Sequence, residues 1–129
     1  MSAPVDGLTL DTGALIALQR GDERVRALLA RASEHGWPIA VPAGVIAQAW
    51  RGGPRQARVA RLLGDPAVET VPLDGLTARA IGVLVGRCGH SDIVDVSVAL
   101  CAAERGHVVV TSDPDDLNTV DEKLTLIQV

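Results

Sequence analysis

Short apolar runs alternate with longer segments of helical periodicity along the whole chain. Five runs have the length and apolar content of buried strands: residues 5–10, 37–41, 67–71, 108–111 and 124–129. Strands that alternate with helices pair in parallel and carry helices on both faces of the sheet. We therefore expect a single α/β domain over residues 1–129, a three-layer α/β/α sandwich around a mostly parallel sheet of about five strands.

Capping residues and glycines indicate where the helices begin and end. Thr12 or Asp11 is expected to cap a first helix over residues 14–20. Asp22 is expected to cap a second helix, which ends at Gly36. Further helices are predicted over residues 42–50, 55–63 and 76–88 and from a cap at Ser91 or Asp92 to about Arg105. Asp115 and Asp116, after the fourth strand, are expected to be turn residues.

The composition is that of a packed protein with an aliphatic core. Hydrophobic residues make up 47% of the chain, and Trp37 and Trp50 are its only aromatic residues. A single-stranded nucleic acid therefore cannot be held by a row of stacked aromatic side chains. Cys88 and Cys101 form no CxxC pair, so a zinc site is not indicated and a disulfide only weakly. The net charge of −4 argues against nonspecific nucleic-acid binding through overall charge, but it leaves room for a local basic patch.

No targeting or membrane-spanning signal is evident. Residues 1–7 lack the basic and long apolar regions of a signal peptide. No apolar run approaches the roughly 18 residues needed to span a bilayer. We expect a cytoplasmic protein with no membrane partner.

Four aspartates fall where strands end or a helix begins. Asp11 follows the first strand, Asp113 follows the fourth, and Asp92 and Asp95 share one face of a first helical turn. Ligands of a parallel sheet bind outside the carboxyl ends of its strands. Gathered carboxylates favour Mg²⁺ or Mn²⁺, which can activate water and stabilise the leaving oxygen of a phosphodiester. Each aspartate taken singly is equally compatible with an ordinary cap or turn.

Three segments together resemble the PIN-domain nucleases, in particular the VapC-type toxins of type II toxin–antitoxin systems. Leu8 to Leu18 resembles the family's opening strand and helix, Ser91 to Leu100 its third acidic motif, and Val109 to Leu117 its closing strand and acidic turn. The likeness covers nearly the whole chain. It implies a five-stranded parallel sheet, ribonuclease activity that depends on Mg²⁺ or Mn²⁺, a homodimer, and inhibition by a small antitoxin protein.

The resemblance assigns the metal-binding and catalytic acids. Asp11 and Asp113 take the places of the family's first and last metal-binding acids. Both Asp92 and Asp95 are candidates for the third; Asp92 has the better register with the motif, and Asp95, one turn on, would assist it. Three neighbouring residues are candidates for contacts that support the metal ligands: Thr12, Ser112 and Asp116.

One catalytic position departs from the family pattern. The helix after the second strand usually carries a Glu where this chain has Gln48. An amide oxygen can coordinate a metal or bind its water, but it brings no negative charge. The change is expected to weaken metal binding or alter its pH dependence, unless the second acid of the Asp92/Asp95 pair offsets it.

A basic cluster follows the helix that carries Gln48. Arg55, Arg58 and Arg61 lie at three-residue spacing, with Arg51 just before them. Because guanidinium groups bind phosphate bidentately, we expect Arg51, Arg55 and Arg58 to contact RNA; a solvated helix face is the alternative. His90 is a further candidate for contact with a substrate phosphate or leaving group.

Three functions account for this pattern of residues. The leading hypothesis is a metal-dependent endoribonuclease that acts as a VapC-type toxin. The alternative, motivated by Gln48, is a catalytically attenuated PIN-like module that binds RNA or protein. Phosphoaspartate chemistry shares the strand-then-Asp layout but fits poorly, because Thr12-Gly13 after Asp11 gives neither a DxD motif nor an acid pair.

Overall fold

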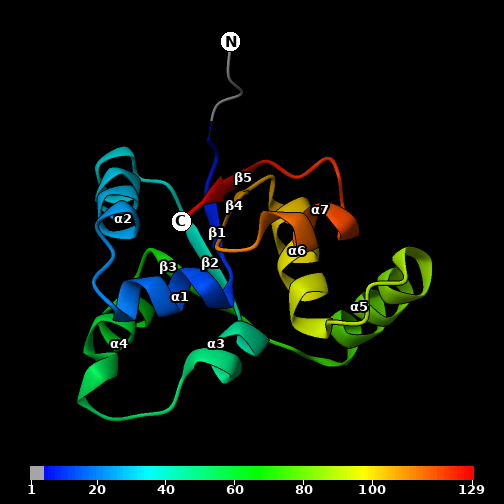
Figure 1. Ribbon diagram of the computed structural model, residues 1–129, viewed down its shortest axis with the longest axis horizontal. Helices are drawn as coiled ribbons and strands as arrows, with labels where there is room; N and C mark the ends of the chain where they lie inside the picture. Colours follow the sequence, from blue (N-terminus) through cyan, green and yellow to red (C-terminus); the bar gives the residue numbers. More distant parts are fainter. Residues whose placement is uncertain (1–4) are drawn as a thin grey trace.

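A five-stranded, fully parallel sheet forms the centre of the structure, a computed structural model that describes residues 5–129 (Figure 1). Its strand order is β3-β2-β1-β4-β5, so β1 lies in the middle, where Leu8 pairs with Ile39 of β2 and with Val108 of β4. The strands are β1 (Leu8–Leu10), β2 (Ile39–Pro42), β3 (Val68–Val71), β4 (Val108–Thr111) and β5 (Leu126–Gln128).

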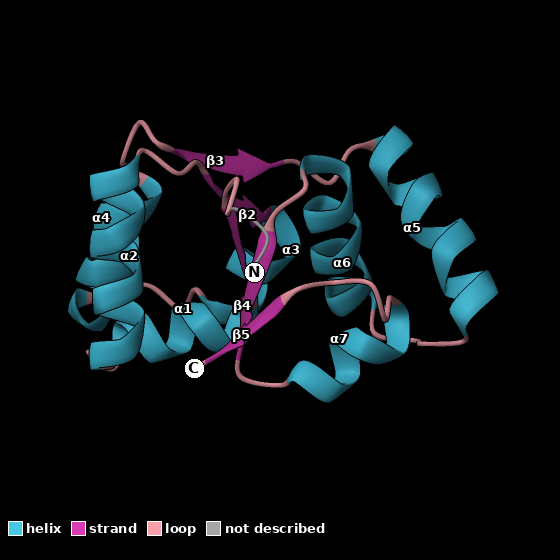
Figure 2. Cartoon of the chain, turned by 90° about the horizontal axis from the view of Figure 1, so that it is seen from above, coloured by secondary structure: helices cyan, strands magenta, loops and turns pink. Residues whose placement is uncertain are grey.

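Helices cover both faces of this sheet. Helices α1, α2 and α4 lie on one side and α5, α6 and α7 on the other (Figure 2). The predicted three-layer α/β/α architecture with five parallel strands is therefore confirmed. The helices are α1 (Thr12–Gln19), α2 (Glu23–His35), α3 (Ala43–Ala49), α4 (Ala57–Leu63), α5 (Gly75–Cys88), α6 (Ile93–Arg105) and α7 (Pro114–Val120), and a 3₁₀ turn, η1, spans Pro54–Gln56.

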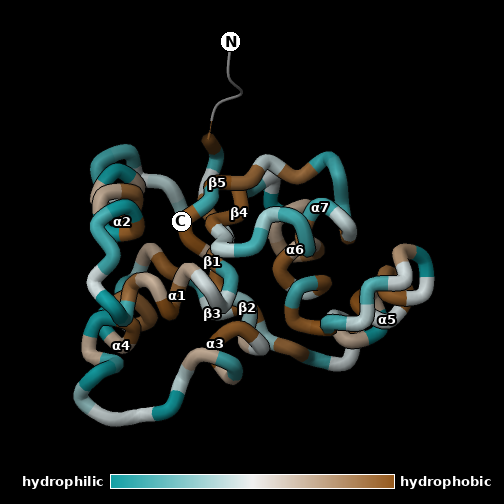
Figure 3. Tube along the Cα trace, viewed as in Figure 1, coloured by the Kyte–Doolittle hydropathy of each residue, from teal (hydrophilic) through white to brown (hydrophobic). Residues whose placement is uncertain are grey.

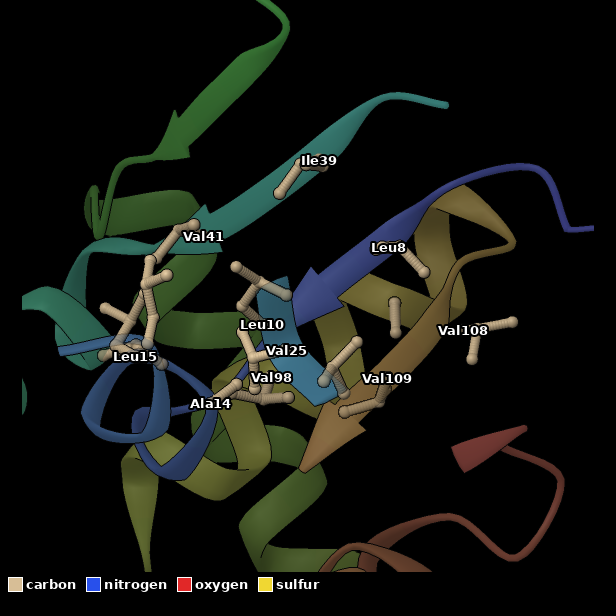
Figure 4. Packing of buried hydrophobic residues seen from close by; sticks show 14 of the residues in the cluster. Leu8, Leu10, Ala14, Leu15, Val25, Ile39, Val41, Val98, Val108 and Val109 are labelled. Atoms are coloured by element: carbon tan, nitrogen blue, oxygen red, sulfur yellow. The ribbon is translucent and has the colours of Figure 1, made fainter. Parts of the chain in front are cut away.

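Aliphatic side chains from the central strands and their covering helices form the core. Leu10 of β1 and Val109 of β4 pack with Leu15 of α1 and Val98 of α6, and all four are fully buried (Figure 4). Strands buried on both faces are near-continuous apolar runs, as β1 and β4 are. The hydrophobic stretches in Figure 3 accordingly lie along these strands, and the hydrophilic ones on the outer turns of α2.

Aspartate caps fix the start of several helices. The Asp11 side chain accepts a hydrogen bond from the backbone N–H of Ala14 (2.8 Å) and begins α1, so Asp11 rather than Thr12 is the cap. Asp22 accepts from the amides of Arg24 and Val25 and begins α2. Such a cap contributes about 1 kcal/mol, and Asn serves as well as Asp. The chain thus enters both helices at defined residues close to the ends of the strands.

Two element predictions were wrong. The turn expected at Asp115 and Asp116 is helix α7, because Pro114 is favourable in a first helical turn and Leu117 and Val120 bury one face. The helix expected over residues 55–63 divides into η1 and α4. β1, β3 and β5 are also shorter than expected, whereas β4 spans the predicted residues and β2 is shifted to Ile39–Pro42.

The cysteines and the lengths of the apolar helices bear on two further sequence expectations. Cys88 and Cys101 are free thiols. Between residues 5 and 129, no helix is long and apolar enough to cross a bilayer. Residues 1–4, which belong to the segment inspected for a signal peptide, lie outside the described residues.

Gly13 lets the loop after β4 approach the first turn of α1. A Cβ at this position would overlap the Ser112 hydroxyl and lie 2.7 Å from the Ser112 Cβ. We predict that Gly13→Ala lowers the free energy of unfolding by about 1–3 kcal/mol through overpacking, measured by urea denaturation. In a Ser112→Gly background the same change should cost clearly less, because both clashing atoms are gone.

Gly82→Ala is the matched control for this substitution. An added Cβ there meets open space on α5, so helix propensity should stabilise the variant by up to about 1 kcal/mol. An equal cost of Gly13→Ala with and without the Ser112 side chain would contradict the packing explanation.

Candidate functional site

The candidate acids come together at the carboxyl edge of the two central strands. β1 ends one residue before Asp11, and β4 ends two residues before Asp113. The backbone N–H of Asp11 donates to the carbonyl oxygen of Val110 (3.1 Å), so the two strand ends lie side by side. Topology therefore brings together two acids that are about a hundred residues apart in the sequence.

Asp11 is the most buried of these acids, with 7% of its surface exposed. Burial raises the pKa of its carboxyl, and hydrogen bonds from the Thr111 side chain and the Ala14 amide partly counter the rise. The charges of Asp95 and Asp113 raise this pKa further. Asp11 is therefore held rigidly in a position where its negative charge is unfavourable.

Asp95 lies in the first turn of α6, with a quarter of its side chain exposed. Its pKa is raised by burial first, and then by the charges of Asp92 and Asp113. The Oδ2 atom of Asp95 lies 3.1 Å from Nε2 of His90, and this contact lowers the pKa in part. His90 thus orients Asp95, a partnership that the sequence did not reveal.

Asp92 has a different environment from Asp95. It is exposed, and its carboxylate caps α6 by accepting from the backbone N–H groups of Val94 (2.9 Å) and Asp95 (3.2 Å). The charges that act on Asp11 come from Asp95 and Asp113. The charge of Asp95 thus acts on Asp11, and the charge of Asp92 acts on Asp95.

Asp113 and Asp116 lie at the start of α7. Asp113 occupies the cap position, but its side chain caps no backbone N–H; its own N–H donates to Thr111 Oγ1 (2.9 Å). A side-chain hydrogen bond with Asp113, and then the charge of that residue, raises the pKa of the exposed Asp116. Asp113 therefore has a free carboxylate with a second acid beside it.

Gln48 is connected to the acids through Thr12. The Thr12 hydroxyl donates to Gln48 Oε1 over 2.6 Å, which joins the start of α1 to the last turn of α3. Thr12 directly follows Asp11, so Gln48 lies beside the acidic group. Ser112 packs on the other side of this turn, against Gly13.

The acidic group suits a divalent cation that keeps much of its water. Within residues 5–129, no three His, Cys, Asp or Glu side chains form a preformed ligand cluster. No Lys or Arg forms an ion pair with Asp11, Asp95 or Asp113 in that part of the chain. Mg²⁺ usually takes one or two carboxylates and fills its other positions with water and phosphate oxygens. A loose set of hard oxygen donors without a Lys or Arg partner among the described residues fits that chemistry.

The sequence profile of the PIN domain matches residues 8–123, which span all the candidate acids. The chain belongs to the PIN domain family. Members of this family are nucleases. No curated protein matches the chain in sequence.

Solved structures of toxin–antitoxin complexes share the fold of this PIN domain. VapBC2 from Rickettsia felis, bound to a DNA fragment from its promoter, has a TM-score of 0.70 at 16% identity, covering 95% of this chain and 98% of that chain. A toxin–antitoxin complex from Klebsiella pneumoniae has a TM-score of 0.69 at 15% identity, covering 95% and 97%. FitAcB from Neisseria gonorrhoeae has a TM-score of 0.61 at 19% identity, covering 94% and 96%.

The candidate arginines of this PIN domain do not form one cluster. Arg51 donates through Nη1 to the carbonyl oxygens of Ala47 (3.2 Å) and Trp50 (2.8 Å), at the end of α3. Arg55 and Arg58 instead line a hollow beside α1 and α4. Three further arginines line the same hollow: Arg61, Arg20 and Arg26. The sequence pattern indicated Arg61 but neither of the other two.

The substitution Asp11→Asn removes the negative charge of Asp11 but keeps its helix cap. The folded-state pKa of Asp11 is raised, so its ionisation costs stability at neutral pH, and Asn keeps the cap without ionising. We predict that Asp11→Asn melts a few degrees above wild type in EDTA, measured by scanning calorimetry. Mn²⁺ should raise the melting temperature of wild type but not of the variant.

Asp22→Asn provides the control. It changes a cap of the same kind at the start of α2, away from the acids. This variant should melt close to wild type and respond to Mn²⁺ as wild type does. If Asp11→Asn is less stable than Asp22→Asn, the buried charge of Asp11 does not destabilise the fold. If Mn²⁺ stabilises both variants equally, Asp11 does not bind the cation.

Proposed function

We propose that this PIN domain is a metal-dependent endoribonuclease in which Asp11, Asp95 and Asp113 hold Mg²⁺ or Mn²⁺. The observation that carries the proposal is the gathering of these acids at the carboxyl edge of the sheet, where burial and neighbouring carboxylates raise the pKa values of Asp11 and Asp95. Family membership supports nuclease chemistry. Phosphoaspartate chemistry has no such support.

The residues around the three acids have distinct parts in this proposal. An ion held by Asp11, Asp95 and Asp113 would supply positive charge for the phosphate oxygens and for an attacking water. The Ala14 amide and Thr111 orient Asp11, and His90 orients Asp95. Asp116 lies beside Asp113 and has a raised pKa, and a cation bound at Asp113 would favour loss of the Asp116 proton.

In this proposal Asp92 and Gln48 do not bind the metal but hold the elements that carry the three acids in place. Asp92 fixes the first turn of α6 and so sets the position of Asp95. Gln48 accepts from Thr12 and keeps the start of α1 against α3. Its amide can bind a metal-bound water but does not increase the negative charge.

We also propose the toxin role, with a small antitoxin as partner and RNA as substrate in the cytoplasm. The structures that share this fold include toxin–antitoxin complexes. A homodimer stays a prediction, for which exposed apolar residues near α5 and α6 offer a surface: Leu73, Leu76, Val83 and Ile93.

Cleavage assays with Asp95→Asn and Asp92→Asn test the assignment of the third acid. We predict Mn²⁺-dependent cleavage of structured RNA by wild type, with a loss of at least about 100-fold in Asp95→Asn, since even indirect support of a metal ligand is worth up to that factor. Asp92→Asn should keep most activity, because Asn also caps a helix. Equal losses in the two variants, or full activity in Asp95→Asn, would contradict the assignment.

Gln48 motivates the alternative, an attenuated PIN-like module that binds RNA or protein without cutting. The same assay with Gln48→Glu separates the two functions. Under the proposed function wild type already cleaves, and the added charge increases Mn²⁺ affinity. Cleavage that appears only in Gln48→Glu would favour the alternative.

A further inference from the structure

Five arginines from four helical segments surround one open hollow at the far end of α1. Arg20 follows α1, Arg26 belongs to α2, and the others come from η1 and α4. The hollow has a volume of about 850 Å³. We call it the arginine hollow, defined by Arg20, Arg26, Arg55, Arg58 and Arg61.

The positive charge of the arginine hollow is largely uncompensated. It holds five of the chain's eleven arginines, although the net charge of the chain is −4. In residues 5–129, Arg26 forms the only ion pair of the five, an exposed contact with Glu23 at 3.1 Å. Arg58 donates to the carbonyl oxygen of Gln19 (3.1 Å), which fixes its guanidinium at the rim. Gathered like charges favour an anionic ligand that spans several of them.

The hollow and the acids lie at opposite ends of one helix. Asp11 caps the first residue of α1 and Arg20 follows its last. Eight helical residues make α1 about 12 Å long. Figure 1 shows α1 running from the end of β1 to the side of the molecule where α2 and α4 lie. A strand that crosses the acids therefore reaches the hollow within a few nucleotides.

The lining of the hollow favours a phosphate backbone over a protein segment. Apart from the arginines it consists of Gln19, Pro54 and Ala57, so it offers little apolar surface for a partner helix. It contains no aromatic side chain on which a base could stack. Guanidinium groups match phosphate oxygens in a bidentate geometry and read no sequence there.

We propose that the arginine hollow binds backbone phosphates of the RNA strand, a few nucleotides from the bond cleaved at the acids. This inference rests on the proposed ribonuclease function and extends it by a second contact region. The hollow positions the strand along α1 and adds affinity that does not depend on sequence. It also accounts for RNA binding by a chain whose overall charge is negative.

The test compares two double variants that remove the same charge. Arg55→Gln with Arg61→Gln changes the hollow; Arg79→Gln with Arg87→Gln changes exposed arginines of α5, on the other side of the sheet (Figure 2). The probe is a labelled single-stranded RNA of mixed sequence, about 16 nucleotides long. Fluorescence anisotropy in EDTA measures its affinity across a salt series, so that neither metal nor cleavage is needed.

We expect the hollow variant to bind about tenfold more weakly, with a salt slope smaller by roughly 0.7 for each arginine removed. The α5 variant should bind as wild type does. Unchanged RNA affinity and salt slope in the hollow variant would overturn the proposal. Equal losses in both variants would also overturn it, because the effect would then come from net charge alone. Unchanged RNA binding with weakened binding of poly-L-glutamate in the hollow variant would overturn it in favour of an acidic protein partner.

A cleavage assay of the same proteins with Mn²⁺ keeps the two proposals apart. Hollow-dependent RNA binding without cleavage by wild type would contradict the ribonuclease function and leave the RNA contact in place. Cleavage by wild type with RNA binding that is insensitive to Arg55 and Arg61 would contradict only the inference about the hollow. Matching far-ultraviolet circular dichroism and melting temperatures establish that each variant is folded.

Discussion

The arrangement of the candidate site depends on the buried carboxylate of Asp11. Its backbone continues β1 towards β4, and its side chain begins α1, so the chain cannot move it without disturbing both elements. Asp95 and Asp113 then add their charges from α6 and from the end of β4. Within the described residues, no Lys or Arg pairs with these three acids, and His90 contacts Asp95. The arrangement is less stable than a neutral one would be, because burial and the neighbouring charges both raise the pKa of Asp11.

The surrounding structure keeps these acids in place through contacts between distant parts of the chain. Thr12 and Gln48 join α1 to α3, and His90 holds Asp95 from the loop before α6. The close approach of Ser112 to Gly13 seats the loop after β4 against α1. Helix α1 connects the two regions, because Asp11 precedes its first residue and Arg20 of the arginine hollow follows its last.

Much of the fold could be predicted from local sequence. β1 and β4 are buried on both faces, so they appear as short, largely apolar runs, and the aspartates that follow them are directly visible. Helix α7 was missed because its proline and two acids are also typical of a turn; only the burial of Leu117 and Val120 against the rest of the molecule makes it a helix.

The site could be predicted only in part, for physical reasons. Asp92 and Asp95 share one face of a helical turn, so spacing alone does not show which of them approaches Asp11. The distinction depends on how α6 packs on the sheet. Arg20 and Arg26 likewise precede Arg55 and Arg61 by some thirty residues, and only the packing of α1 with α2 and α4 gathers them around one hollow.

Locating Mn²⁺ by anomalous scattering is the most direct test of the central claim. The crystals should contain the protein, Mn²⁺ and a non-cleavable RNA, so that substrate phosphate is available as a ligand. The account predicts an anomalous peak at coordination distance from Asp11 and from at least one of Asp95 and Asp113. A peak coordinated by Asp92 alone, or no peak near Asp11 at saturating Mn²⁺, would contradict it.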